Sequence, residues 1–163
     1  MTTKERYRRV IEYFSVAMPT AESELNFNNP FELLVAVVLS AQCTDKRVNM
    51  VTPRLFPLYP DAFAMAKLES EELEPLIREC GLYRNKAKNI IGAAQRIIDV
   101  YGGEVPNTME DLLTLPGTGR KTANLVLGDI FKKPAIVVDT HCIRLSNRIG
   151  LTKNSDPVKI EMD

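Results

Sequence analysis

The chain has 163 residues, of which 45% are hydrophobic and 26% are charged, and its 21 basic side chains balance its 21 acidic ones. The length suffices for one or two small domains with a core, and the composition is ordinary for a soluble globular protein. The longest apolar run, Leu33 to Leu39, is far too short to cross a bilayer, so we expect a cytoplasmic, intracellular protein with no membrane partner.

The first two predicted helices differ in the arrangement of their apolar residues. A first helix, ending before Pro19, carries one apolar stripe made of Tyr7, Val10, Ile11 and Phe14. A second helix begins at Asn29-Pro30, with Glu32 placed for a capping box, and runs through Leu39 with apolar residues on nearly all sides. We therefore expect the second helix to be central and buried, and the stripe of the first to need a partner.

Three more helices are predicted in the middle of the chain. One runs from Asp45 toward Leu58, although Pro53 should bend it or end it early. Ser70 is expected to cap a helix that reaches residues 78–80 and stops at a glycine. The next helix spans residues 86–100 and has an apolar inner face.

The last third of the chain continues the helical pattern. Asn107 with Glu110 predicts a capping box and a short helix, and a longer helix follows Gly119. An extended segment at 134–138 leads to a helix over 139–149, and another helix start is expected at Asp156-Pro157. No strand alternation and no repeat interrupts these helices, so the predicted fold class is all-α.

The most informative stretch is residues 115–123, Leu-Pro-Gly-Thr-Gly-Arg-Lys-Thr-Ala. Two glycines behind a proline and ahead of an apolar helix are typical of a tight turn that opens a helix. Such a turn would present the backbone amides of Gly117, Gly119 and Arg120 to a phosphate at the positive end of the helix dipole. The same pattern also occurs where an ordinary helix ends in a linking turn, so the local pattern leaves both interpretations open.

The full string is more specific than its parts. It resembles the helix-hairpin-helix element of the endonuclease III family of DNA glycosylases. Further segments match that family in order and approximate spacing: residues 39–42 (Leu-Ser-Ala-Gln), 44–45, 81–83 (Gly-Leu-Tyr), 86–87, 102–106 and 138–141 (Val-Asp-Thr-His). The resemblance covers about residues 29–150. It implies base-excision repair of double-stranded DNA that carries a damaged base or an abasic site.

The resemblance also implies a domain organisation. Residues 29–134 would form a helical barrel domain, with the helix-hairpin-helix at about 108–131. Residues 1–28 and 135–163 would belong to a second, incomplete helical domain, because the family's further helices and its four-cysteine iron–sulfur loop are not found here. The stripe of the first helix would then be exposed or would support a homo-oligomer.

Lys121 and Asp139 fall where the family carries its catalytic lysine and aspartate. An amine nucleophile suits a glycosylase that also nicks the strand, because attack on the sugar leaves an iminium that activates the adjacent hydrogen for β-elimination. Asp139 would take the proton of the amine and stabilise positive charge on the sugar. The alternatives are a solvated lysine that touches phosphate and a plain helix cap.

Other positions are assigned to base flipping by the same resemblance. Gln42 and Leu82 match positions from which the family inserts side chains into the gap left by a flipped base. Gln42 could instead be a polar helix terminus, and Leu82 a core leucine. Ser40, Asp45 and His141 are candidates for the pocket, although His141 could be an ordinary hydrogen-bonded helix residue.

A net charge of zero is unusual for a protein that binds nucleic acid, because affinity normally comes from Lys and Arg on phosphates. Any basic surface must therefore be local. Besides the hairpin, we expect DNA contacts from Arg84, Lys86 and Thr122, and the alternative for each charged residue is a solvated helix face.

The cysteines give no sign of a metal site. Cys43, Cys80 and Cys142 are odd in number and widely spaced, which favours reduced structural thiols over a disulfide framework or a zinc module. They do not match the family's iron–sulfur motif. We therefore assign no metal and no cofactor to this chain.

Two functions of different classes follow from these patterns. The main hypothesis is a bifunctional DNA glycosylase and abasic-site (AP) lyase that removes oxidised pyrimidines through a Schiff base on Lys121. This chain would be weakly active or inactive, because part of the second domain is missing. The alternative is a non-catalytic helix-hairpin-helix module that only grips phosphate. Lys121 argues against a monofunctional mismatch glycosylase, and the match to 8-oxoguanine glycosylases is poorer.

Overall fold

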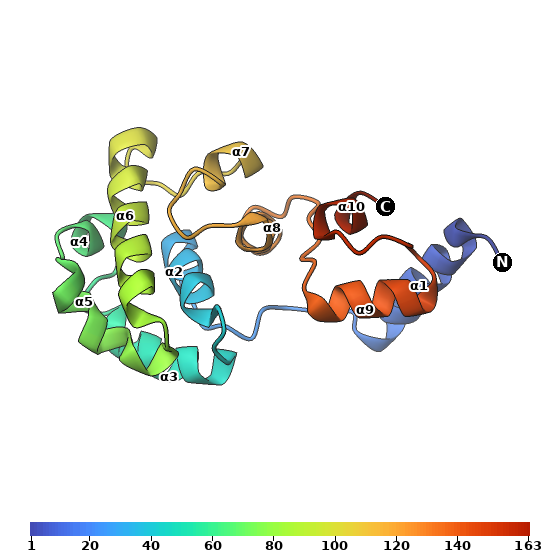
Figure 1. Ribbon diagram of the computed structural model, residues 1–163, viewed down its shortest axis with the longest axis horizontal. Coiled ribbons are helices and arrows are strands. Elements are labelled where there is room, and N and C mark those ends of the chain that lie inside the picture. The colour runs from blue at the N-terminus through green and yellow to red at the C-terminus, as the bar shows by residue number, and fades with distance from the viewer. The chain divides into compact units, whose positions relative to one another are not determined.

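Helices joined by turns make up the secondary structure of the computed structural model, which describes residues 1–163 (Figure 1). The all-α prediction is confirmed. The chain divides into two compact units: unit 1 contains residues 1–22 and 136–163, and unit 2 contains residues 23–135. None of the helices is long and apolar enough to cross a membrane.

Unit 2 contains most of the helices and the main hydrophobic core. In chain order its helices are α2 (Pro30–Ser40), α3 (Asp45–Leu55), α4 (Ala62–Ala66), α5 (Ser70–Ile77), the 3₁₀ helix η1 (Arg78–Cys80), α6 (Tyr83–Tyr101), α7 (Met109–Leu112) and α8 (Arg120–Asp129).

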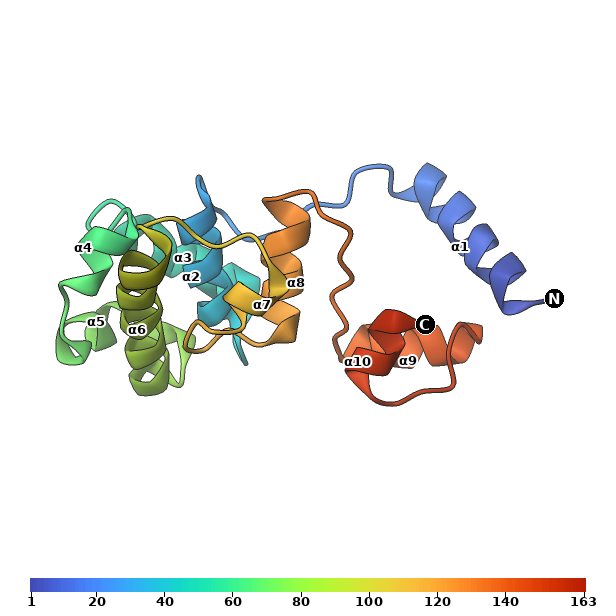
Figure 2. The same ribbon diagram turned by 90° about the horizontal axis from the view of Figure 1, so that it is seen from above.

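Helix α2 lies at the centre of unit 2, as its apolar sequence predicts. Every residue from Phe31 to Leu39 is buried, and the helix packs against α3, α6 and α8. Both views of the ribbon show α2 between α6 and α8 (Figures 1 and 2). Its start differs slightly from a capping box: Asn29 Oδ1 accepts from Glu32 N at 2.9 Å, but the Glu32 carboxylate accepts from Asn28 N instead of Asn29 N.

Several helix boundaries differ from those predicted. Helix α6 begins at Tyr83, before the predicted Lys86, because Leu82 takes a left-handed conformation and turns the chain directly into the helix. Ser70 is the first residue of α5 and not its cap, since the backbone N–H of Glu69 binds the Glu72 carboxylate at 2.8 Å.

Two further differences concern the short helices α7 and α4. Thr108, not Asn107, caps α7, because its hydroxyl accepts from Asp111 N. Helix α4 was not predicted. Helix α3 ends at Leu55 with Pro53 in its last turn, which agrees with the expectation that this proline bends the helix or ends it early.

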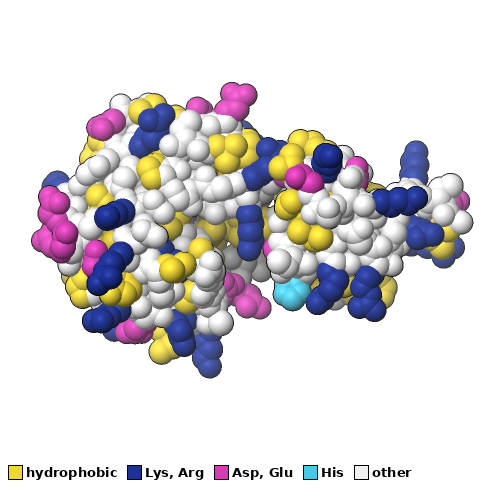
Figure 3. Space-filling model, viewed as in Figure 1, with side chains coloured by type: hydrophobic (Ala, Val, Ile, Leu, Met, Phe, Trp, Pro, Cys, Tyr) yellow, Lys and Arg dark blue, Asp and Glu magenta, His cyan; other side chains and the backbone are white.

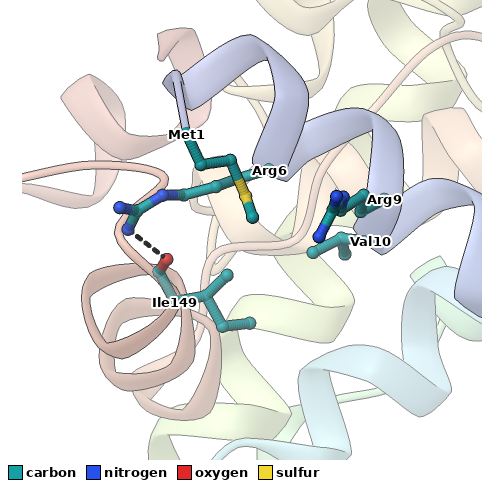
Figure 4. Close-up of a pocket in the computed structure, with 5 residues that line it drawn as sticks. All are labelled: Met1, Arg6, Arg9, Val10 and Ile149. Atoms are coloured by element: carbon teal, nitrogen blue, oxygen red, sulfur yellow. Dashed lines mark hydrogen bonds between the residues drawn. The ribbon is translucent and has the colours of Figure 1, made fainter.

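Unit 1 contains α1 (Thr3–Ala17), α9 (Thr140–Ile149) and α10 (Pro157–Met162). Helix α1 has no buried residue. Arg6 Nη1 donates to Ile149 O at 3.0 Å, so α1 is tied to the last turn of α9 (Figure 4). An open pocket beside this contact is lined by Met1, Arg6, Arg9, Val10 and Ile149.

Candidate functional site

The glycine hairpin between α7 and α8 uses its two glycines differently. Gly117 has φ +76°, and a Cβ at this position would lie 2.7 Å from Asn89 Cβ. The amide of Thr118 closes the turn on Leu115 O at 3.1 Å. Gly119, by contrast, is the N-cap of α8 with φ −91°, and a Cβ there would meet nothing within 4 Å. Gly117 is therefore needed for the fold of the turn, whereas Gly119 keeps the approach to the helix end open.

Lys121 and Thr122 lie in the first turn of α8, where backbone N–H groups have no acceptor within the helix. Lys121 is exposed, and Thr122 and Arg120 are half-buried. The positive end of the helix dipole and the open side of Gly119 suit an anion. The hydroxyl of Thr118, in the glycine hairpin before α8, is buried without a hydrogen-bond partner.

Asp139 caps α9 in unit 1. Its Oδ1 accepts from Cys142 N at 2.8 Å, as the capping interpretation predicts. Burial raises the pKa of the Cys142 thiol, and the negative charge of Asp139 adds to this rise. Asp139 is half-buried. Because Lys121 lies in unit 2, a joint role for the two side chains stays a prediction.

Gln42 and Leu82 are both exposed and both have a left-handed backbone, with φ +52° and +47°. Leu82 is 54% exposed, so it is not a core leucine. Left-handed backbone costs a residue with a Cβ about 1–2 kcal/mol. Such strain persists where the surroundings fix it, and it clusters at ligand sites.

The three predicted pocket residues belong to different units. Ser40 and Asp45 lie on either side of the turn after α2, and Ser40 Oγ donates to Val37 O at 2.7 Å. His141 is exposed in unit 1, with Nδ1 3.2 Å from Arg144 Nη2. This contact within α9 is consistent with the alternative of a hydrogen-bonded helix residue.

Lys86 differs from the predicted surface contact. It is only 4% exposed, and its Nζ donates to Leu39 O and Cys80 O, each at 2.8 Å. Because α6 begins at Tyr83, Lys86 faces the interior one turn into the helix. Burial lowers the pKa of Lys86. Its ammonium cannot reach a phosphate without losing both contacts, so the prediction that it contacts DNA is wrong.

The remaining basic residues are dispersed. Arg84 is exposed, with its guanidinium 5.4 Å from the centre of the Tyr83 ring and 4.0 Å from the Glu74 carboxylate. On the face shown in Figure 3, Lys and Arg side chains occupy several separate places with acidic side chains among them. Phosphate binding would then depend on local groups such as the hairpin.

The cysteines are free thiols in different surroundings. Cys43 and Cys80 lie near Lys86, and the pKa of Cys80 is raised to about 11, mainly by burial. Cys142 belongs to the other unit. Two thiols beside an ammonium, with a third elsewhere, do not fit the four-thiolate ligand set of an iron–sulfur cluster.

The family model described as the HhH-GPD superfamily of base excision DNA repair proteins matches residues 35–163. Endonuclease III of Synechocystis sp. is 52% identical over 161 residues, which are 98% of this chain and 74% of that protein. Endonuclease III of Bacillus subtilis is 53% identical over 140 residues, which are 86% of this chain and 64% of that protein.

Solved structures of endonuclease III and of another DNA glycosylase are also similar to this chain. The structure of a trapped endonuclease III–DNA covalent intermediate has a TM-score of 0.93 at 48% identity and covers 99% of this chain and 76% of its own. A thermostable thymine-DNA glycosylase has a TM-score of 0.82 at 25% identity and covers 89% of this chain and 68% of its own.

Proposed function

Because the chain belongs to the HhH-GPD superfamily of base excision DNA repair proteins, we propose that it is a DNA glycosylase and AP lyase acting on oxidised pyrimidines. The observation that carries this proposal is an exposed Lys121 in the first turn of α8, directly after the glycine hairpin. A phosphate held at the hairpin would bring the neighbouring sugar to the lysine amine.

The proposed reaction begins with the neutral amine of Lys121, which attacks C1′ of the damaged nucleotide. The bond from C1′ to the base breaks, and the base leaves with the electron pair. The amine gives up one of its two protons. The C1′–O4′ bond then breaks, O4′ keeps the electron pair and takes up a proton, and the opened sugar carries an iminium between Nζ and C1′. Loss of a proton from C2′ then expels the 3′ phosphate by β-elimination, and water releases the lysine.

Asp139 is proposed to accept the proton of the amine and to stabilise positive charge on the sugar as the base departs. Its capping bond uses Oδ1 and fixes the carboxylate at the start of α9. Both roles require a carboxylate, so Asp139→Asn should keep the cap and lose the chemistry.

The substrate base must leave the duplex before the sugar can react, at a cost of about a few kcal/mol. We propose that the exposed side chains of Gln42 and Leu82 fill the space that it vacates. Ser40 and Asp45, beside the Gln42 turn, would then face the extruded nucleotide.

Borohydride trapping tests the enzyme against the alternative of a binding module. Borohydride reduces the iminium to a stable amine, so abasic duplex DNA should become covalently attached to the wild-type protein. The adduct should disappear in Lys121→Ala and persist in Lys67→Ala, which removes an exposed lysine after α4. Tight DNA binding with no adduct from the wild type would favour the non-catalytic module.

Lesion preference is tested with duplexes that differ in one base. We expect release of oxidised pyrimidines and little release of 8-oxoguanine or of mismatched adenine. Preferential release of a purine would contradict the proposed substrate class while leaving the lyase chemistry intact.

A further inference from the structure

Lys86 joins the ends of two helical segments that lie far apart in the sequence. Its Nζ donates to Leu39 O in the last turn of α2 and to Cys80 O at the end of η1, each at 2.8 Å. All of these residues belong to unit 2. A single side chain of α6 therefore donates hydrogen bonds to the ends of both segments.

The carbonyl at the end of α2 depends on this lysine. The last four carbonyls of a helix have no donor within it. In α2, three of them receive bonds from the Ser40 hydroxyl, Ala41 N and Cys43 N. Leu39 O is the fourth, and Lys86 supplies its donor. A cation also suits the negative end of a helix dipole.

The two carbonyls that Lys86 binds, Leu39 O and Cys80 O, each lie just before a strained turn. Gln42 follows Leu39 by three positions, and Leu82 follows Cys80 by two. These are two of the three residues other than glycine that have a positive φ; the third is Lys132. Both side chains are exposed, while the ammonium that binds the two preceding carbonyls is buried.

A buried ammonium is an expensive way to stabilise a core. Lys86 is 4% exposed and takes part in none of the ion pairs of the chain. Burial lowers its pKa, which reflects the penalty on the charged form. Even where a buried charge is paired, apolar residues of similar volume often replace the pair at no loss of stability. The geometry that Lys86 imposes is therefore a better reason for its presence than stability alone.

We propose that Lys86 is a positioning residue that holds the Gln42 turn (residues 41–44) and the Leu82 turn (residues 81–83) at a fixed separation, so that the two exposed side chains enter a DNA duplex together. This inference rests on the proposed function, which assigns Gln42 and Leu82 to the gap beside an extruded nucleotide. Lys86 itself touches no DNA.

Lys86→Met tests the proposal, because it keeps the length of the side chain and removes its donors. Binding to a duplex that contains a tetrahydrofuran abasic analogue is measured for Gln42→Ala and Leu82→Ala, each with and without Lys86→Met. In the wild-type background each alanine should weaken binding. In the Lys86→Met background, the additional loss of binding affinity caused by each alanine should be smaller by about threefold or more, since uncoupled turns no longer act together.

Lys88→Met is the matched control, because it removes an exposed lysine from the same helix. Its effect should add to those of Gln42→Ala and Leu82→Ala, whatever its own effect on binding. A general loss of stability by Lys86→Met would also leave the effects additive. Additive effects with Lys86→Met therefore overturn the proposal.

Hydrogen exchange of the DNA-free protein provides a second readout. The amides of Ala41, Cys43 and Gly81 belong to the two turns and donate to carbonyls of the residues that precede them. Lys86→Met should accelerate exchange in both turns, and Lys88→Met in neither. Unchanged exchange in either turn overturns the proposal.

A shorter side chain covers the case in which Lys86→Met does not fold. The amide nitrogen of Lys86→Gln is one bond nearer the backbone, so it should reach one carbonyl and loosen the other turn. If Gln42→Ala and Leu82→Ala weaken binding as much in the Lys86→Gln background as in the wild type, the proposal is overturned. Failure of the proposed function looks different: the wild type forms no borohydride adduct, and the exchange result alone then decides whether Lys86 couples the turns.

Discussion

The Cys80 thiol makes the stability of unit 2 depend on pH. Its pKa is raised from 9.0 to about 11, mainly by burial. The native state therefore keeps a proton that the unfolded state loses. This contribution to stability is fully present below pH 9 and is lost as the pH rises through about 11, and it amounts to about 2–3 kcal/mol at most.

Urea unfolding of the wild type and of Cys80→Ala between pH 8 and pH 11 measures this contribution. The free energy of unfolding should fall more steeply above pH 9 in the wild type than in the variant. Burial lowers the pKa of Lys86, so this group changes stability with pH in the opposite sense, and it is present in both proteins. Parallel pH profiles would contradict the raised pKa.

Individual residues were predictable where a local rule fixes them. Asp139 caps α9 as its type and place indicate. The charge of Lys86 predicts an exposed side chain, and this prediction is wrong. Its spacing was the better guide, since it lies four positions before the buried Ile90 on the inner face of α6. Its two carbonyl partners could not be predicted, because one lies far away in the sequence.

At the scale of elements, the hairpin offers a matched pair of substitutions. Gly117→Ala should destabilise the protein by about 1–3 kcal/mol, because it adds left-handed strain and a contact with Asn89. Gly119→Ala should leave stability nearly unchanged but weaken duplex binding, since its methyl group enters the open space before α8. Thermal melts and fluorescence anisotropy with a labelled duplex measure the two effects.

The pair separates folding from phosphate binding. Equal losses of stability in both variants would mean that Gly119 also serves the fold. Undiminished binding by a folded Gly119→Ala would move the phosphate site away from the hairpin.

Helices were predicted better than their ends. The long apolar pattern of α2 identifies a central helix, because a helix that is apolar on all sides can be buried only in the middle of the other helices. Ends depend on which of two neighbouring polar residues caps the helix, as with Asn107 and Thr108. Helix α4 has five residues and almost no polar face, so periodicity gives no signal.

At the scale of the whole molecule, unit 1 has little core of its own. Its buried residues are Thr152 and Ile160, whereas Tyr7 is 54% and Phe14 45% exposed on the predicted stripe of α1. A small core fixes side chains weakly. Asp139 belongs to this unit, and self-association through α1 stays a prediction.

We therefore expect slow turnover. Strand nicking by this chain should be about tenfold or more slower than nicking by Synechocystis endonuclease III on the same abasic duplex, which corresponds to about 1.4 kcal/mol or more of barrier. Gel assays under single-turnover conditions measure both rates, with Lys121→Ala as the blank. Equal rates would show that unit 1 holds Asp139 well enough as it is.

At Gln42 and Leu82, which have left-handed backbones, selection for stability and selection for the proposed activity favour different residues. A laboratory evolution campaign rewarded only for heat tolerance should enrich glycine or asparagine at these two sites, because both relieve the local conformational penalty. The selected variants would resist thermal unfolding better but would lack the side chains that the proposed activity requires.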